Sequence, residues 1–148
     1  MASRDKLPIE ITHHVRDTCL CLHVQRAARA LARRFDDALR PVQLTHGQFS
    51  LLNALNQVEA PGMSKVAALL TMDRTTLTAN LKPLERRGLV TVTTDPADKR
   101  GRSLMLTAAG HAALRAAVPV WKRTHAAIER TLAATGPDTL RADLRALS

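Results

Sequence analysis

The sequence is short of glycine, of long apolar runs and of cysteine, and each shortage excludes a class of protein. Its six glycines are scattered along 148 residues, and no glycine-rich phosphate loop, GxSxG turn or HExxH motif is present, so we expect no enzyme. The apolar runs CLCL, VAALL and AAVPVW are far shorter than the roughly 20 residues that cross a bilayer. The start, MASRDKLPIEI, does not resemble a secretory signal. A cytoplasmic protein is expected, and its two cysteines then indicate no structural disulfide.

Acidic residues are also in the minority. The chain has 22 Lys and Arg against 13 Asp and Glu, a net charge of +9 and an isoelectric point near 11.0. Such an excess favours a polyanionic partner, and the phosphate backbone of DNA is the obvious one. An acidic membrane surface is an alternative polyanion, but the basic segment has no apolar anchor beside it, so no membrane partner is expected.

Residues 64–110 have the outline of a winged helix-turn-helix. A short apolar helix is predicted over 64–70, followed by a break at 71–73 and a second helix over 74–87. Leucines three and four residues apart form an apolar stripe on the second helix, so one face is expected to dock and the other to remain open. Pro83 predicts either a bend or a tolerated kink in this helix.

Two short strands joined by a basic loop follow the second helix. Residues 89–94 alternate apolar and polar side chains, many of them β-branched, and the returning segment SLMLT alternates likewise. The connection from Asp95 to Arg102 is too long for a tight turn, so a projecting wing is predicted. Arg100 is placed to enter a DNA minor groove, and Asp98 is expected to hold its guanidinium by a charge-assisted hydrogen bond. The alternative is an exposed ion pair of little energy.

The segments RTTLTANLKPLERRGLV and DPADKRGRSLMLTAAG resemble the winged-helix core of the MarR family of bacterial transcription regulators. The resemblance covers most of the chain, from the helix near residue 13 to the end. It implies a mainly α fold, in which a winged helix-turn-helix with a two-stranded β wing accompanies long N- and C-terminal dimerisation helices. It also implies a homodimer that binds a pseudo-palindromic operator in double-stranded DNA. Such a regulator, here expected to be a repressor, is released by a small-molecule effector or by thiol oxidation.

A single domain over residues 1–148 is expected, with 13–40 and 108–148 as dimerisation helices and 45–107 as the DNA-binding lobe. Apolar stripes on the terminal helices indicate burial against a second copy, although a bundle closed within one chain would satisfy the same pattern. Helix boundaries follow from caps and prolines. We expect one helix from about His13 to Leu39, one after a Thr45 and Gln48 capping box, one from Thr107 to about Thr135 and one beginning at Pro137.

The basic and short polar side chains of the second helix and the wing are the candidate DNA contacts. They are Arg74, Thr75, Thr76, Thr78, Asn80, Lys82, Arg86, Asp98, Lys99, Arg100 and Arg102. Recognition helices in the resembled family often carry a basic residue where this chain has Ala79, so base contacts are expected to depend more on the threonines, Asn80 and Lys82. An ordinary solvated helix face is the alternative. A nonspecific DNA-binding protein would share the same charge.

Two cysteines and three other residues are candidates for an effector pocket or a redox site: Cys19, Cys21, His23, Trp121 and His125. Cys21 falls near the reactive thiol of the resembled family's organic-peroxide sensors, but this chain has no tyrosine, so the tyrosine partners of that branch are missing. Inert cysteines are the alternative, and a thiol enzyme is the rival class. Too few ligands accompany Cys19 and His23 for a metal site, so neither metal nor cofactor is expected. Trp121 and His125 lie on the apolar face of the helix predicted after Thr107. They are expected either to be part of the core or to line an effector pocket.

Overall fold

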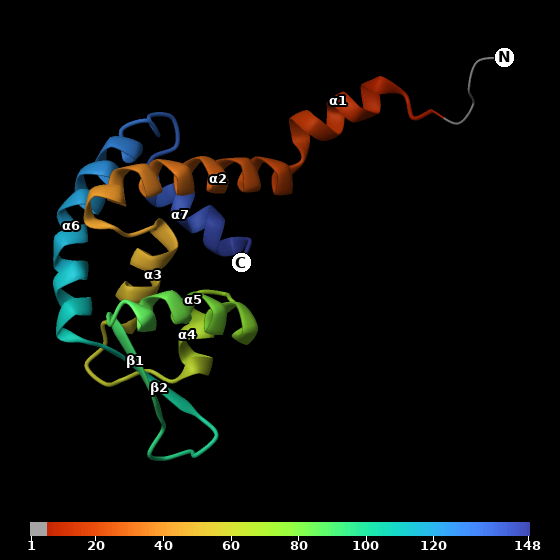
Figure 1. The fold of residues 1–148 in the computed structure, drawn as a ribbon. Helices are drawn as coiled ribbons and strands as arrows, with labels where there is room; N and C mark the ends of the chain where they lie inside the picture. The colour runs from red at the N-terminus through yellow and green to blue at the C-terminus, as the bar shows by residue number, and fades with distance from the viewer. Residues whose placement is uncertain (1–5) are drawn as a thin grey trace. The chain divides into compact units, whose positions relative to one another are not determined.

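The computed structural model describes residues 6–148 (Figure 1). The chain divides into two compact units, one ending at Arg34 and one from Phe35 to Ser148. The elements in chain order are α1 (Ile9–Thr18), α2 (Leu20–Leu39), a 3-10 turn (Arg40–Val42), α3 (His46–Leu55), α4 (Met63–Leu69), α5 (Arg74–Arg86), β1 (Val90–Thr94), β2 (Arg102–Leu106), α6 (Ala108–Glu129) and α7 (Pro137–Ala146). This order confirms the mainly α fold with a winged helix-turn-helix.

The N-terminal helical segment is interrupted at Cys19, which corrects the prediction of one helix over 13–39. Cys19 has an extended backbone, with φ −66° and ψ 108°. The Thr18 hydroxyl donates to the carbonyl of His14 at 2.7 Å, and such side-chain bonds compete with the regular helix ladder. The carbonyl of Cys19 then accepts from the backbone N–H of His23 at 3.1 Å, so a second helix begins directly after the break.

α3 begins with the predicted capping box. The Thr45 hydroxyl accepts from the backbone N–H of Gln48 at 3.1 Å, and the Gln48 side chain accepts from the backbone N–H of Thr45 at 3.1 Å. These two bonds satisfy helix-terminal donors that would otherwise be unpaired. Beyond the cap, the apolar face of α3 is buried at Leu51, Leu52 and Leu55, and α3 packs against α4, α6 and β2.

α4 and α5 form the predicted helix-turn-helix. Thr71 turns the chain in the left-handed region, with φ 50°, and the Met72 N–H donates to the carbonyl of Ala67 at 2.9 Å. α5 continues through Pro83 to Arg86, so the proline is tolerated and does not end the helix. The predicted apolar stripe of α5 is fully packed. Its leucines are Leu77, Leu81 and Leu84, which are 0%, 2% and 0% exposed.

β1 and β2 form the wing as an antiparallel pair, in register from Val90 opposite Leu106 to Thr94 opposite Arg102. The wing is anchored to the segment before α4, because the Leu104 N–H donates to the carbonyl of Pro61 at 3.0 Å. Leu104 itself is 0% exposed. The strands begin at the core and extend away from the helices, and the 95–101 loop forms the tip of the wing (Figure 1).

The start of α6 is joined to the end of the helix-turn-helix by Thr107. Its hydroxyl accepts from the Gly110 N–H at 3.0 Å, which confirms the predicted cap, and donates to the carbonyl of Gly88 at 2.6 Å. Its own N–H donates to the carbonyl of Leu89 at 3.1 Å. The absence of a side chain at Gly110 lets the start of α6 lie close to Leu89, because a Cβ at this position would lie 2.1 Å from the Leu89 carbonyl oxygen.

The C-terminal helices differ from prediction in one boundary. α6 ends at Glu129 and does not reach Thr135, because the hydroxyl and the N–H of Thr131 both turn back to the carbonyl of Ile128, at 2.7 and 2.9 Å. α7 begins at Pro137, as predicted. Arg141 of α7 donates to Glu129 at 2.8 Å. No helix within residues 6–148 has the length and apolar character needed to cross a bilayer.

Candidate nucleic-acid interface

The N-terminus of α5 is defined by Asp73. Its carboxylate accepts from the backbone N–H of Thr76 at 2.8 Å and from the hydroxyl of Thr76 at 2.8 Å. Both bonds lower the pKa of Asp73 below its ordinary value of 3.8, and the backbone bond has the larger effect. The carboxylate therefore stays ionised where the positive end of the helix dipole favours it. Asp73 was not among the predicted site residues, although its place as a capping residue before Arg74 was a visible signal.

Basic side chains from α4, α5 and the wing surround two adjoining hollows of about 280 and 350 Å³. Arg74, Arg100 and Arg102 line both of them. We call the two hollows together the α5–wing cleft. Its cations are Lys65, Arg74, Lys82, Arg100 and Arg102, and its acidic residues are Glu85, Asp95 and Asp98.

None of the five cations of the cleft forms an ion pair within residues 6–148. Two of the three carboxylates, by contrast, are turned to the backbone of the loop, since Asp95 accepts from the Ala97 N–H and Asp98 from the Arg100 N–H, each at 2.9 Å. With five cations against three carboxylates, the cleft keeps a net positive charge, and none of its cations is held in an ion pair within residues 6–148. Such a concentration of unpaired cations is what a phosphate backbone requires.

The role predicted for Asp98 needs correction. Its carboxylate accepts from the backbone N–H of Arg100 at 2.9 Å, and in the described chain no ion pair joins the two side chains. The carbonyl of Asp98 also accepts from the Gly101 N–H at 2.9 Å. Aspartate commonly bonds the backbone two residues on in this way. Asp98 therefore shapes the loop, and the Arg100 guanidinium is left without a carboxylate partner in residues 6–148.

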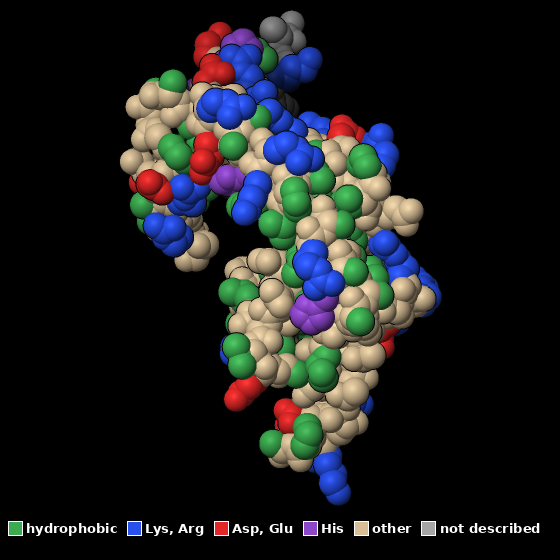
Figure 2. Space-filling view, turned by 90° about the vertical axis from the view of Figure 1, so that its left-hand side faces the viewer, with side chains coloured by type: hydrophobic (Ala, Val, Ile, Leu, Met, Phe, Trp, Pro, Cys, Tyr) green, Lys and Arg blue, Asp and Glu red, His purple; other side chains and the backbone are tan. Residues whose placement is uncertain are grey.

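The remaining predicted DNA contacts lie on exposed parts of the same elements. Thr75, Lys82 and Arg86 are exposed on α5, and Lys99 is exposed in the wing loop. Figure 2 shows a basic side chain projecting at the lower end of the molecule, where Figure 1 places the wing. Asn80 is also exposed, but its side-chain amide is already engaged, since it donates to the sulfur of Met72 at 3.5 Å. Sequence reasoning missed Lys65, which contributes to the cleft from α4.

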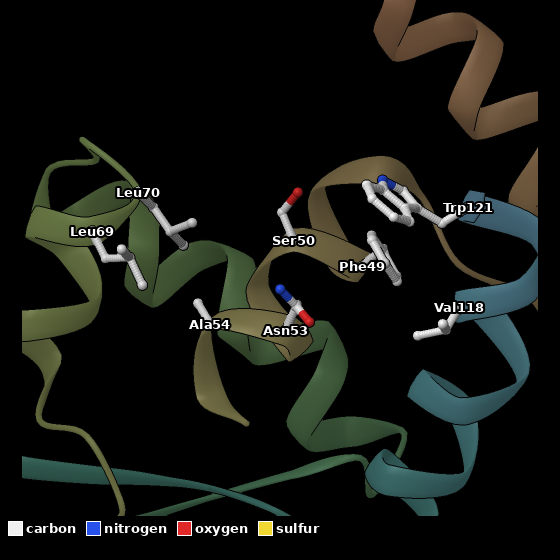
Figure 3. A pocket seen from close by; sticks show the side chains of 8 residues that line it. All are labelled: Phe49, Ser50, Asn53, Ala54, Leu69, Leu70, Val118 and Trp121. Atoms are coloured by element: carbon white, nitrogen blue, oxygen red, sulfur yellow. The ribbon is translucent and has the colours of Figure 1, made fainter. Parts of the chain in front are cut away.

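A separate groove of about 550 Å³ lies over α3, between α6 and the end of α4. Figure 3 shows Leu69 and Leu70 on one side, Trp121 and Val118 on the other, and residues of α3 between them. Of the predicted pocket residues, Trp121 lines this groove. His125 is stacked on Trp121 with ring centroids 4.6 Å apart, and its Nδ1 lies 3.5 Å from Glu129.

The other predicted redox or effector residues belong to the N-terminal unit. Cys19 is partly buried and Cys21 is exposed, and the Gln25 amide donates to the Cys21 sulfur at 3.3 Å. The ring Nδ1 of His23 is bonded to the backbone carbonyl of Cys19 at 2.8 Å, not to its thiol. Within residues 6–148 no three His, Cys, Asp or Glu side chains are grouped so that they could hold a metal ion.

Comparison with known proteins identifies the class of protein that this fold and cleft define. The model of the MarR family matches residues 44–101. The structure of the M. tuberculosis transcriptional regulator MosR in complex with DNA is 40% identical, with a TM-score of 0.79, and the match covers 87% of this chain and 92% of that chain. A mutant E. coli MarR in complex with operator DNA has a TM-score of 0.80 over 90% of this chain and 96% of that one, but at 23% identity it supports the fold alone.

A curated relative, the transcriptional regulator HosA of Escherichia coli O111:H-, is 39% identical over 79 residues. That match covers 52% of this chain and 57% of HosA, so it spans little more than half the length of the relative. The MosR match, in contrast, extends over almost the whole of both chains. This chain belongs to the MarR family.

Proposed function

We propose that this chain is a homodimeric, sequence-specific DNA-binding regulator of transcription that acts as a repressor. The observation that carries the proposal is the α5–wing cleft, where five cations without ion-pair partners in residues 6–148 come together from α4, α5 and the wing. Membership of the MarR family and the DNA present in the MosR structure support the same function. Because a regulator of this kind binds the chromosome, the proposal includes a cytoplasmic location. It also includes no enzymatic activity.

In the proposed complex, the exposed face of α5 lies in the major groove and the wing lies along the adjacent backbone and minor groove. Arg74, Lys82 and Arg86 provide positive charge along α5, while Lys99, Arg100 and Arg102 provide it along the wing. Because phosphate contacts position a protein and base contacts specify its site, we expect the reader of sequence to be found among the short polar residues of α5. Asp98 contributes indirectly, by holding the shape of the loop that carries Arg100.

In the proposed dimer, each chain forms a single domain. Residues 45–107 are its DNA-binding lobe, and residues 13–40 and 108–148 pair with a second copy. α1 has no buried residue and α2 buries only Leu39 within the described chain. Apolar side chains on these helices remain substantially exposed. They include Ile11 (46%), Val15 (53%), Val24 (40%) and Leu31 (41%). An isologous contact between copies would cover them and set two lobes on one pseudo-palindromic operator.

Effector release is part of the proposal, and the groove over α3 is its proposed site. Apolar walls with a few polar groups are typical of small-molecule sites, and Ser50 and Asn53 supply those groups beside Phe49 and Trp121. Oxidation of Cys21 is the alternative signal, favoured by its exposure. Either signal would act by changing the spacing between the two lobes, since a rigid operator tolerates little change in half-site separation.

Competition binding tests the proposal against nonspecific DNA binding. A duplex selected by the protein from a random-sequence pool is labelled, and excess unselected duplex is added at fixed salt. A specific regulator retains the selected duplex, since specific affinity typically exceeds nonspecific affinity by about 10³ or more. Equal displacement by both duplexes would assign the chain to the nonspecific class, and absence of binding at low salt would contradict any DNA-binding function.

A further inference from the structure

The three threonines in the first turns of α5 differ in what their hydroxyl protons bind. The Thr76 hydroxyl donates to Asp73 at 2.8 Å, and the Thr78 hydroxyl donates to the backbone carbonyl of Arg74 at 2.8 Å. The Thr75 hydroxyl has no hydrogen-bond partner within residues 6–148. All three side chains are exposed, so their exposure does not distinguish them, whereas their hydrogen bonds do.

A hydroxyl group has one proton to donate and two lone pairs that accept. Once its proton is engaged, it can meet a DNA donor such as an amino group, but it must break its own bond before it donates to a phosphate oxygen or a purine N7. For Thr76 that exchange would also remove a bond from the capping carboxylate of Asp73. Of the three, Thr75 alone can offer both its proton and its lone pairs to DNA without breaking a hydrogen bond within residues 6–148.

The position of Thr75 on the helix agrees with a role in reading bases. Thr75, Ala79 and Lys82 are spaced by four and three residues, so they share one face of α5. The side chain of Ala79 is small and apolar, which lets the helix approach the groove closely. Thr78 shares this face, three residues from Thr75 and four from Lys82, but its hydroxyl proton is bonded to the carbonyl of Arg74. Of the two threonines on this face, Thr75 is therefore the one whose hydroxyl proton has no acceptor within residues 6–148. Residues near the N-terminus of a recognition helix are those that reach base edges in the major groove.

We infer that Thr75 is the specificity-determining hydroxyl of α5, donating to an acceptor on a base edge in the major groove. Thr76 is a positioning residue that holds the helix start through Asp73, and Thr78 contributes no donated hydrogen bond to DNA. The inference rests on the proposed function, since it assumes that α5 enters the groove. It narrows the group of predicted base contacts to one threonine.

Three matched substitutions test the inference, because valine has nearly the shape of threonine without the hydroxyl. Thr75→Val, Thr76→Val and Thr78→Val are each compared with the unsubstituted protein for affinity to its selected duplex, affinity to random duplex, salt dependence and thermal unfolding. Loss of one neutral hydrogen bond weakens binding by roughly threefold to tenfold. Thr75→Val is expected to lower the ratio of specific to nonspecific affinity by that factor, with unchanged salt slope and melting temperature.

Thr76→Val and Thr78→Val are the controls for Thr75→Val, because each removes a hydroxyl whose proton is bonded within the protein. Thr76→Val is expected to lower the melting temperature, with Thr76→Ser restoring it, while the affinity ratio stays within about twofold of the original. Thr78→Val is expected to leave the affinity ratio within about twofold. Scanning single base pairs of the selected duplex should show that Thr75→Val loses discrimination at one position only.

The result that overturns the inference is an unchanged affinity ratio in Thr75→Val, or a lowered ratio in Thr78→Val at an unchanged melting temperature. Failure of the proposed function has a different signature. If the unsubstituted protein selects no preferred duplex from the random pool, then the function is wrong and the inference fails with it. If it selects one and Thr75→Val keeps the preference, only the inference is wrong.

Discussion

At the residue scale, charge in the wing decides how strongly the proposed interface holds phosphate. The guanidinium of Arg100 has no ion-pair partner within residues 6–148, so no internal bond has to break before it meets DNA. Asp98 is engaged with the loop backbone and does not compete for it. Together with Lys99 and Arg102, this charge is therefore expected to contribute directly to the affinity of the wing for DNA.

Arg100→Ala is expected to weaken binding to the selected duplex and to flatten its salt dependence. Removal of one cation from a phosphate reduces the slope of log affinity against log salt by about 0.9. Fluorescence anisotropy titrations at several salt concentrations measure this slope. Arg123→Ala, which removes an exposed arginine of α6 outside the cleft, is the matched control and should leave the slope unchanged. An unchanged slope in Arg100→Ala would exclude a phosphate role for that side chain.

Sequence reasoning expected a contact between Asp98 and the Arg100 guanidinium, but the structure shows a contact between Asp98 and the Arg100 backbone. The spacing of Asp98 and Arg100 places the carboxylate within reach of both the guanidinium and the backbone N–H of Arg100. In the structure, the carboxylate of Asp98 accepts from the backbone N–H of Arg100. An aspartate two residues before an N–H closes a local turn in this way with little loss of side-chain freedom. Residue spacing alone does not show which of these two donors the carboxylate accepts from.

At the element scale, the start of α5 depends on an ionised carboxylate. Because hydrogen bonds from Thr76 lower the pKa of Asp73 in the folded protein, the cap stabilises the fold above the ordinary pKa of 3.8 and loses this effect as the pH falls below that value. Asp73→Ala is expected to lower the melting temperature near neutral pH, and the difference from the unsubstituted protein should narrow below pH 3.8.

Circular dichroism melts over a series of pH values measure that difference. Asp143→Ala, which removes an exposed aspartate of α7, controls for loss of negative charge and should show no comparable narrowing. A difference for Asp73→Ala that stays constant down to the lowest pH at which the protein is folded would contradict the capping role.

The junction between the wing and α6 depends on the absence of a side chain at Gly110. A Cβ at this position would lie 2.1 Å from the Leu89 carbonyl oxygen, which is backbone and cannot easily move away. Gly110→Ala is expected to destabilise the fold by about 1–3 kcal/mol, the usual cost of overpacking. Urea denaturation followed by circular dichroism measures the free energy of unfolding.

Gly47→Ala is the matched control, because the nearest atom to its Cβ would be 4.0 Å away. Alanine favours a helix over glycine by up to about 1 kcal/mol, so this control should be neutral or slightly stabilising. Equal stability of Gly110→Ala and the unsubstituted protein would show that α6 can leave Leu89 at no cost. The joint between α6 and the helix-turn-helix would then not be rigid.

Helix types and caps were predictable from sequence, whereas two helix ends were not. The cap residues Thr45 and Thr107 and the apolar stripe of α5 follow periodic or positional rules, and the structure has them all. The interruption at Cys19 and the early end of α6 follow from hydroxyls of Thr18 and Thr131 that bond to nearby backbone carbonyls. Apolar periodicity continues across such positions, so it does not reveal them.

At the scale of the whole molecule, the groove over α3 could not be derived from sequence pattern. Its walls come from α3, from Leu69 and Leu70 at the end of α4, and from Val118 and Trp121 of α6. The seam of α6 predicted the inward position of Trp121, but the segments that meet it are distant along the chain. Only the packed fold brings them together.

The proposed dimer predicts a particle of twice the 16.2 kDa chain mass. Leu31→Glu places a charge in the exposed apolar stripe of α2, so it should shift the protein toward monomer and weaken operator binding, because two lobes no longer act together. Light scattering after size exclusion measures the mass. Gln25→Glu adds the same charge away from the stripe and should remain dimeric. A mass unaffected by Leu31→Glu would argue against pairing through this face.

Hydrogen–deuterium exchange of the full chain, with and without its selected duplex, tests the central claim most directly. The account predicts that DNA slows exchange in α5 and in the wing loop, at residues 74–86 and 95–101, because backbone groups there become covered. Random duplex at the same salt should give weaker protection of the same segments. Protection confined to other segments, with α5 and the wing exchanging as in the free protein, would contradict the account.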